Sequence, residues 1–222
     1  MTTATPPRPF DLGDHACAIY SSHTQLVRLV SRFLAEGLER HEHCWYVGPH
    51  GDVRGIRGAL RRRGLDPDRY LHVGALRFLL PSDVYVMWGE FHPTHTDRVF
   101  SDAITQARVD GFRGLRVAAE VSWASAIDDG AERLMAYEAH ACAGFAAAPV
   151  TGLCLYHRRR FSLHVVHGAL LTHPLTAAAR GLAIANPFYD RAVTSLPPGD
   201  DRGVTGKLQV IKNLTHRSAR RR

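Results

Sequence analysis

Leu115-Arg116-Val117-Ala118-Ala119-Glu120-Val121 is a short and nearly continuous apolar run, and Ser122-Trp123 follows it directly. A run of this kind is typical of a strand that is buried on both faces of a sheet. Similar runs occupy residues 15–20, 43–48 and 150–156. Buried strands that alternate with amphipathic helices indicate a parallel sheet covered by helices. We therefore expect a three-layer α/β fold, with a mostly parallel sheet and helices on both faces.

The helical pattern recurs between these strands, with apolar residues three and four positions apart. The ranges expected to be helical are 24–40, 53–63, 94–110, 129–147 and 162–171. Shorter extended segments are expected at 70–73, 76–80 and 182–185, while residues 82–88 fit neither pattern.

One domain is expected over residues 14–192, between a flexible N-terminus (1–13) and a basic, disordered tail (193–222). The chain has 222 residues and a formal net charge of +7, with 28 Lys and Arg against 21 Asp and Glu. All of the excess lies after Asp201, where seven basic residues and no acidic ones occur. The charge therefore excludes a basic nucleic-acid-binding fold. Two interpretations of the basic tail remain. It is either a solvated terminus or a segment that contacts nucleic acid or an anionic surface.

The sequence has features of an intracellular protein without a membrane span. No window approaches the roughly 18 uncharged apolar residues of a membrane-spanning helix. The first residues, MTTATPPRPF, contain no apolar core of a secretory signal. We expect a cytoplasmic protein whose four cysteines, which form no CxxC pair, stay reduced.

The sequence contains no familiar motif for catalysis or for cofactor binding. Residues 20–26 read YSSHTQL, without the glycines and lysine of a P-loop, and neither GxGxxG nor GxSxG occurs. The histidine-dense segments 41–44 and 92–95, and the pair His164 and His167, join into no standard zinc pattern. No catalytic residue, cofactor or metal is therefore predicted.

A candidate ligand site lies at the carboxyl ends of the strands, where α/β sheets bind ligands. Glu120 ends an apolar strand, and an unpaired buried carboxylate is costly. It must therefore be solvated, paired with a positive charge, or used to bind a ligand. Trp123 adds a large apolar face with one N–H donor. With Tyr20, Tyr156 and Arg160 from neighbouring strand ends, these residues are predicted to line a pocket that is half apolar and half polar.

Two residues of the following helix, Tyr137 and Glu138, extend this candidate site. The alternative is an internal ion pair, in which Glu120 or Glu138 meets Arg116 or Arg160.

Five ordered blocks over roughly residues 14–190 carry a family resemblance. They are residues 15–20, residues 33–38 leading into 44–47, residues 114–123 with 137–139, residues 153–161, and residues 171–174 with 186–189. The chain resembles the MEDS domain, the methanogen/methylotroph DcmR-type sensory domain. The resemblance implies a RecA/KaiC-like fold with a degenerate P-loop, in an input module of bacterial and archaeal regulators that responds to small hydrocarbon derivatives.

The first functional hypothesis is a non-enzymatic sensory domain. It would bind a small organic ligand and signal to a transcription regulator, a histidine kinase or an anti-sigma system. The alternative is a protein-interaction scaffold that binds no small molecule. A metal- or nucleotide-dependent enzyme is the third possibility.

Overall fold

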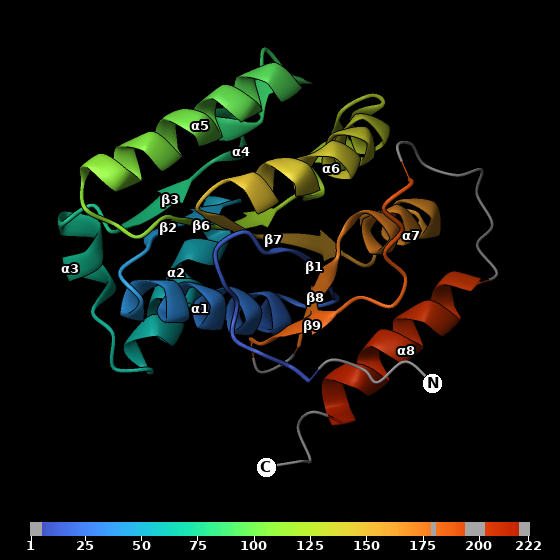
Figure 1. The fold of residues 1–222 in the computed structure, drawn as a ribbon, viewed down its shortest axis with the longest axis horizontal. Coiled ribbons are helices and arrows are strands. Elements are labelled where there is room, and N and C mark those ends of the chain that lie inside the picture. Colours follow the sequence, from blue (N-terminus) through green and yellow to red (C-terminus); the bar gives the residue numbers. More distant parts are fainter. Residues whose placement is uncertain (1–5, 179–180, 194–202, 218–222) are drawn as a thin grey trace.

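A seven-stranded sheet forms the centre of the fold, with the strand order β3-β2-β6-β7-β1-β8-β9 (Figure 1). The computed structural model describes residues 6–178, 181–193 and 203–217. The strands are β1 (His15–Tyr20), β2 (His43–Val47), β3 (Leu76–Leu79), β6 (Leu115–Glu120), β7 (Val150–His157), β8 (Leu175–Ala177) and β9 (Ala183–Ala185). Neighbouring strands from β3 to β8 pair parallel, and β9 pairs antiparallel with β8.

Helices cover both faces of the sheet, as Figure 1 shows. On one face lie α1 (His23–Glu39), α2 (His50–Arg61) and α3 (Pro67–His72), and on the other lie α5 (Pro93–Val109), α6 (Gly130–Ala147) and α7 (Leu163–Thr172). The expected three-layer α/β fold with a mostly parallel sheet is therefore confirmed. The closer likeness to RecA and KaiC stays an expectation from the resemblance.

Alternation along each strand decides which face a side chain meets. On β6, Leu115, Val117 and Ala119 belong to the core beneath α5 and α6. Ala118 packs in the core beneath α1. Arg116 and Glu120, two residues before and after it, lie on the same face of the strand. Two separate cores result, one on each side of the sheet.

The segment between β2 and α5 differs from expectation. Residues 70–73 were expected to be extended but lie mainly in α3. The Asp66 side chain accepts hydrogen bonds from the N–H groups of Asp68 and Arg69, and Pro67 occupies the first turn, so local capping starts a helix. The unassigned stretch contains α4 (Pro81–Val84) and β4 (Val86–Met87), and β4 pairs with β5 (Glu90–Phe91).

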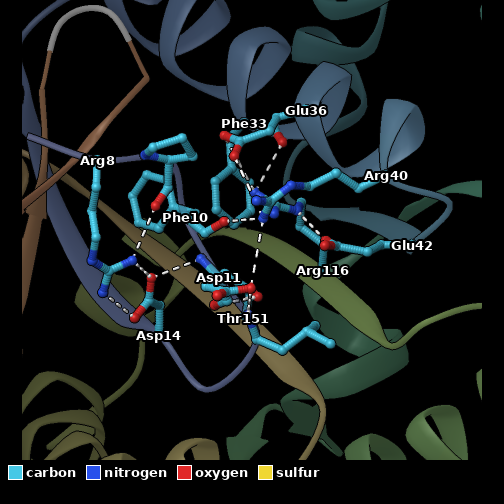
Figure 2. Close-up of polar contacts among 12 residues, drawn as sticks. Arg8, Phe10, Asp11, Asp14, Phe33, Glu36, Arg40, Glu42, Arg116 and Thr151 are labelled. Carbon is cyan, nitrogen blue, oxygen red and sulfur yellow. Dashed lines mark hydrogen bonds and ion pairs between the residues drawn. The ribbon is translucent and has the colours of Figure 1, made fainter.

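The N-terminal segment is packed from residue 8 onward rather than free up to residue 13. Arg8 forms a bridge with Ala183 of β9, and its guanidinium pairs with Asp14 at 2.6 Å. Phe10 is fully buried, and its ring packs edge-on against Phe33 of α1. Both side chains are labelled in Figure 2. Burial of the Phe10 ring opposes the flexibility that the Pro- and Thr-rich composition indicated.

The C-terminal segment contains α8 (Val204–Arg217), where a disordered tail was expected. Val204 is buried, and Leu208 and Ile211 pack against the core beneath α5 to α7. The Lys207 ammonium contacts His167 and lies 5.5 Å from the centre of the Phe188 ring. The helix forms because these apolar residues recur at helical spacing and find a surface on α7. Residues 194–202 and 218–222 of the expected tail lie outside the described residues.

Among the residues described, no helix has the length and apolar character needed to cross a membrane.

Candidate functional site

Tyr20 and Glu120, both predicted site residues, meet on the α1 face at the carboxyl end of the sheet. The Tyr20 hydroxyl donates a 2.7 Å hydrogen bond to Oε1 of Glu120. The Ser122 hydroxyl donates to the same oxygen at 2.5 Å, and the Ser122 N–H donates to Oε2 at 3.2 Å. Burial, and then the nearby carboxylate, raise the pKa of Tyr20. Both carboxylate oxygens of Glu120 thus accept hydrogen bonds from donors within the protein.

A second tyrosine–carboxylate pair lies beside the first. The Tyr46 hydroxyl donates to Asp52 at 2.5 Å, and Nε2 of His23 lies 3.2 Å from the other Asp52 oxygen. Burial is the main cause of the raised pKa of Tyr46, and the hydrogen bond to Asp52 adds to it. Gly48 is required here because a Cβ at this position would lie 2.5 Å from the Tyr46 hydroxyl.

The other three predicted residues lie apart from Tyr20 and Glu120. Tyr156 is fully buried on the opposite face of the sheet. Trp123 lies on that same face and stacks on Tyr85, with ring centroids 5.1 Å apart. Arg160 is exposed. Tyr20 and Glu120 therefore lie on one face of the sheet, and Tyr156 and Trp123 lie on the other. The role of the five residues in ligand binding stays a prediction.

Arg116 pairs with neither of the partners considered from the sequence. It is fully buried beneath α1, and its Nε lies 2.5 Å from the Glu42 carboxylate (Figure 2). Glu36 lies farther away, at 3.9 Å. Gly37 makes room for this guanidinium, since a Cβ there would lie 2.4 Å from Cδ of Arg116. The proposed pairing of Arg116 with Glu120 or Glu138 is wrong because Arg116 turns toward Glu42.

A buried polar cluster lies beneath α6 and α7, around Glu138. Oε2 of Glu138 lies 3.1 Å from Nε2 of His15 and 3.4 Å from Nε2 of His173. The Tyr156 hydroxyl donates to Oε1 at 3.1 Å. All four side chains are buried, so the cluster is shielded from bulk water.

Two cysteines adjoin the buried cluster. Sγ of Cys154 lies 3.6 Å from Nε2 of His15, and Sγ of Cys142 lies 3.2 Å from Nδ1 of the same ring. The Cys142 thiol donates to the Thr172 carbonyl at 3.0 Å. Burial raises the pKa of Cys142 to about 12 and that of Cys154 well above its usual value.

The histidines of the cluster stabilise the Glu138 carboxylate. Burial alone would raise the pKa of Glu138, but His173 and His15 outweigh it and hold the pKa well below the usual value. Burial, and then His173, lower the pKa of His15. Glu138 is therefore the charged member of the pair that it forms with His15.

A groove of about 490 Å³ opens between α5 and α6, above this cluster. Its walls are mainly apolar and include Phe100, Ile104, Phe145, Ala148 and Val150. Polar groups come from Asp97, Ser101, Thr105, Tyr137 and His140. A volume of several hundred Å³, an apolar wall and a few polar groups are the usual features of a small-molecule site.

The groove and the buried cluster share a wall. Phe100, Tyr137 and Phe145 line the groove and also a small inner cavity of about 20 Å³, which reaches Glu138 and His15. That cavity has room for a single water molecule. The Tyr137 hydroxyl donates to Asp97 at 2.9 Å across the groove.

Comparison with protein-family models shows the family to which the chain belongs. The model of the family described as "MEDS: MEthanogen/methylotroph, DcmR Sensory domain" matches residues 14–174. The chain belongs to the MEDS family. No curated protein matches the chain.

The MEDS match contains β1 to β7, α7 and the buried cluster, and it ends before β8 and α8. The family relationship gives the domain a sensory or regulatory role. The matched residues also include the groove, because its lining residues lie between Asp97 and Val150.

Three features of this MEDS domain were not predicted as sites. His15 and His173 stood in the blocks that carried the resemblance, but neither was singled out as a site residue. The groove lies on the α5–α6 face rather than at the strand ends. The one signal for the groove in the sequence was Tyr137, which was expected, with the adjacent Glu138, to extend the site.

Proposed function

We propose that this MEDS domain turns over no substrate, holds a small organic ligand in the groove between α5 and α6, and passes the occupancy of the groove to a regulatory protein. The observation that carries the proposal is the groove itself, with its apolar wall and polar rim above a buried polar cluster. The cytoplasmic location expected from the sequence belongs to the same proposal.

The lining indicates the chemistry of the ligand. Phe100, Ile104 and Phe145 offer an apolar surface for a short hydrocarbon body. The Asp97 carboxylate accepts hydrogen bonds, so it favours a ligand that carries a hydroxyl, amine or amide group. A small hydrocarbon derivative with one polar group fits both requirements.

Helix α6 supplies a physical route from the groove to the rest of the domain. It forms one wall of the groove, and its Glu138 contacts His15 of β1 and His173, which follows α7. Helix α7 in turn contacts α8. A ligand that binds one position of α6 more tightly than another would shift this set of contacts. The partner would then read α7 or α8, and a histidine kinase, an anti-sigma system or a DNA-binding protein are the partner classes expected from the resemblance.

A thermal-shift screen tests the ligand site. The probes are short alcohols, amines, amides and carboxylates, applied to the full chain and to Gly144→Leu. A Cβ at Gly144 meets no atom within 4 Å, so a leucine there extends into the groove without disturbing the helix. The control is Gly58→Leu, the same change on α2.

We expect at least one probe class to raise the melting temperature of the wild type and of Gly58→Leu but not of Gly144→Leu. A screen without any stabilising probe, or an equal shift in Gly144→Leu, would contradict the site.

One observation favours a second candidate function, a protein-interaction scaffold that binds no small molecule. Trp88, at the tip of the β4–β5 hairpin, is 87% exposed. Exposed tryptophans are frequent anchors of protein interfaces. If the domain acts only as a scaffold, Trp88→Ser will abolish capture of a regulatory partner while Gly144→Leu leaves it unchanged.

A further inference from the structure

The buried cluster beneath α6 and α7 brings together four potential metal ligands from separate parts of the chain. They are Nε2 of His15, the Glu138 carboxylate, Sγ of Cys154 and Nε2 of His173, all within 4.8 Å of one another. Every one of these residues is buried. Zn²⁺ is bound by His nitrogen, Cys sulfur and carboxylate oxygen, and four protein ligands without solvent form a closed site.

Three of the six distances between these donor atoms are close to the edges of a tetrahedron. With metal–nitrogen bonds near 2.0–2.1 Å and metal–sulfur bonds near 2.3 Å, neighbouring donors lie about 3.3–3.6 Å apart. Oε2 of Glu138 lies 3.1 Å and 3.4 Å from the two histidine nitrogens. Sγ of Cys154 lies 3.6 Å from Nε2 of His15.

The outer contacts of His173 direct its Nε2 lone pair into the cluster. Nδ1 of His173 lies 2.8 Å from the Ala169 carbonyl, which only accepts, so the proton of the neutral ring is on Nδ1. Nε2 of this fully buried ring then has no hydrogen-bond partner among the described residues. A histidine that donates its other N–H to a carbonyl is the usual arrangement of a metal ligand.

The outer contacts of His15 lead to the same arrangement. The Cys142 thiol has one proton, and it is donated to the Thr172 carbonyl. The contact between Nδ1 of His15 and Sγ of Cys142, at 3.2 Å, therefore needs an N–H donor on the ring. The Nε2 lone pair of neutral His15 is then also directed at Oε2 of Glu138.

With both rings neutral and protonated at Nδ1, three acceptors converge on one point: two imidazole lone pairs and a carboxylate oxygen, with the Cys154 sulfur beside them. Acceptors that face each other in a buried space repel unless a proton or a metal ion lies between them. We propose that this cluster is a binding site for a divalent transition-metal ion of the zinc type, ligated by His15, Glu138, Cys154 and His173. The site uses ligands from β1, α6, β7 and the end of α7, so the ion would join these elements on one face of the sheet.

Cobalt(II) titration of the tag-free, chelator-treated full chain tests the site, because Co²⁺ replaces Zn²⁺ in tetrahedral sites and gives visible spectra. We expect intense d–d bands and a thiolate-to-cobalt charge-transfer band that saturate at about one Co²⁺ per chain and disappear when Zn²⁺ is added. Cys154→Ala should lose the charge-transfer band. Cys44→Ala is the matched control, since Cys44 is an equally buried thiol on the opposite face of the sheet.

Two outcomes would overturn the metal site. One is a wild-type chain that shows no saturable cobalt spectrum, in which case a proton rather than a metal ion satisfies the cluster. The other is a charge-transfer band that Cys154→Ala retains. If Cys154→Ala fails to fold, Tyr156→Phe provides the second variant. It removes the hydrogen bond to Oε1 of Glu138 and should weaken Co²⁺ binding roughly 10- to 100-fold, the usual effect of losing an outer-shell contact. Unchanged affinity in Tyr156→Phe would count against Glu138 as a ligand.

The inference does not rest on the groove ligand. Gly144→Leu should leave the cobalt spectrum unchanged, so failure of the metal site and failure of the ligand site are distinguishable.

Discussion

The phenyl ring of Phe145 lies flat on the imidazole of His15, with centroids 4.3 Å apart and planes 5° apart. Phe145 also lines both the α5–α6 groove and the small inner cavity. The Phe145 ring is therefore the part of the shared wall that lies directly on the buried polar cluster.

Removal of this ring should open the cluster to small reagents. In Phe145→Ala, the thiol of Cys154 becomes reachable from the groove, so we expect alkylation by iodoacetamide to be severalfold faster than in the wild type. Mass spectrometry of the metal-free protein measures the rate at each cysteine. Cys44, on the other face of the sheet, is the internal control. Equal acceleration at Cys44 would indicate general loosening and would contradict the specific role of Phe145.

Gly144 on the exposed wall of the groove allows a test of stability. Because a Cβ there meets no atom within 4 Å, Gly144→Ala removes the entropic cost of glycine in a helix without a clash. We expect the free energy of unfolding to rise by about 0.5–1 kcal/mol, as measured by urea denaturation. A decrease would show that the backbone of α6 at this point needs glycine.

The buried ion pair between Arg116 and Glu42 should show strong coupling. Arg116→Met leaves the Glu42 carboxylate buried and unpaired, which should cost about 3–5 kcal/mol. The double variant Glu42→Leu/Arg116→Met removes both charges and should be more stable than Arg116→Met alone. Urea denaturation of the four proteins in this cycle gives the coupling energy. Additive effects would mean that the two side chains do not interact in solution.

Stability should fall at alkaline pH because folding raises the pKa of several tyrosines. Burial is the largest cause for Tyr20, Tyr46, Tyr85, Tyr137 and Tyr156. The unfolded state then releases these protons first, at its ordinary pKa of about 10. The stability is therefore fully present below about pH 10 and is lost as pH rises above it.

Tyr46→Phe isolates one member of this set. Its free energy of unfolding should decline less steeply above pH 10, by up to about 1.4 kcal/mol per pH unit. Urea midpoints between pH 8 and pH 11 measure the slope. An identical slope in the wild type and the variant would contradict the raised pKa of Tyr46.

The sheet could be predicted from the sequence because its central strands are nearly continuous apolar runs. Strand β6 is the clearest case, since Arg116 and Glu120 alone interrupt its apolar residues. Strand β8 and helix α3 were missed for a physical reason. Both are short, and neither depends on a periodic pattern of apolar residues. Strand β8 forms by pairing with β1, and α3 begins at the cap provided by Asp66.

The candidate site was only partly predictable, because strand register is not visible in one sequence. The carboxyl ends of β1 and β6 do bring Tyr20 and Glu120 together. Tyr20, however, stands opposite His157 in the ladder, so Tyr156 points to the other face. His15 and His173 meet Glu138 only through the packing of α6 and α7, which no local pattern encodes.

Methyl NMR spectra of isoleucine-labelled protein test the groove site most directly, during titration with the organic compound that gives the largest thermal shift. Ile104 lines the groove, whereas Ile184 lies on β9 at the far edge of the sheet. We expect saturable shifts of the Ile104 methyl signal, little change at Ile184, and no response in Gly144→Leu. Saturable binding that leaves Ile104 unchanged would place the ligand elsewhere and contradict the proposed groove site.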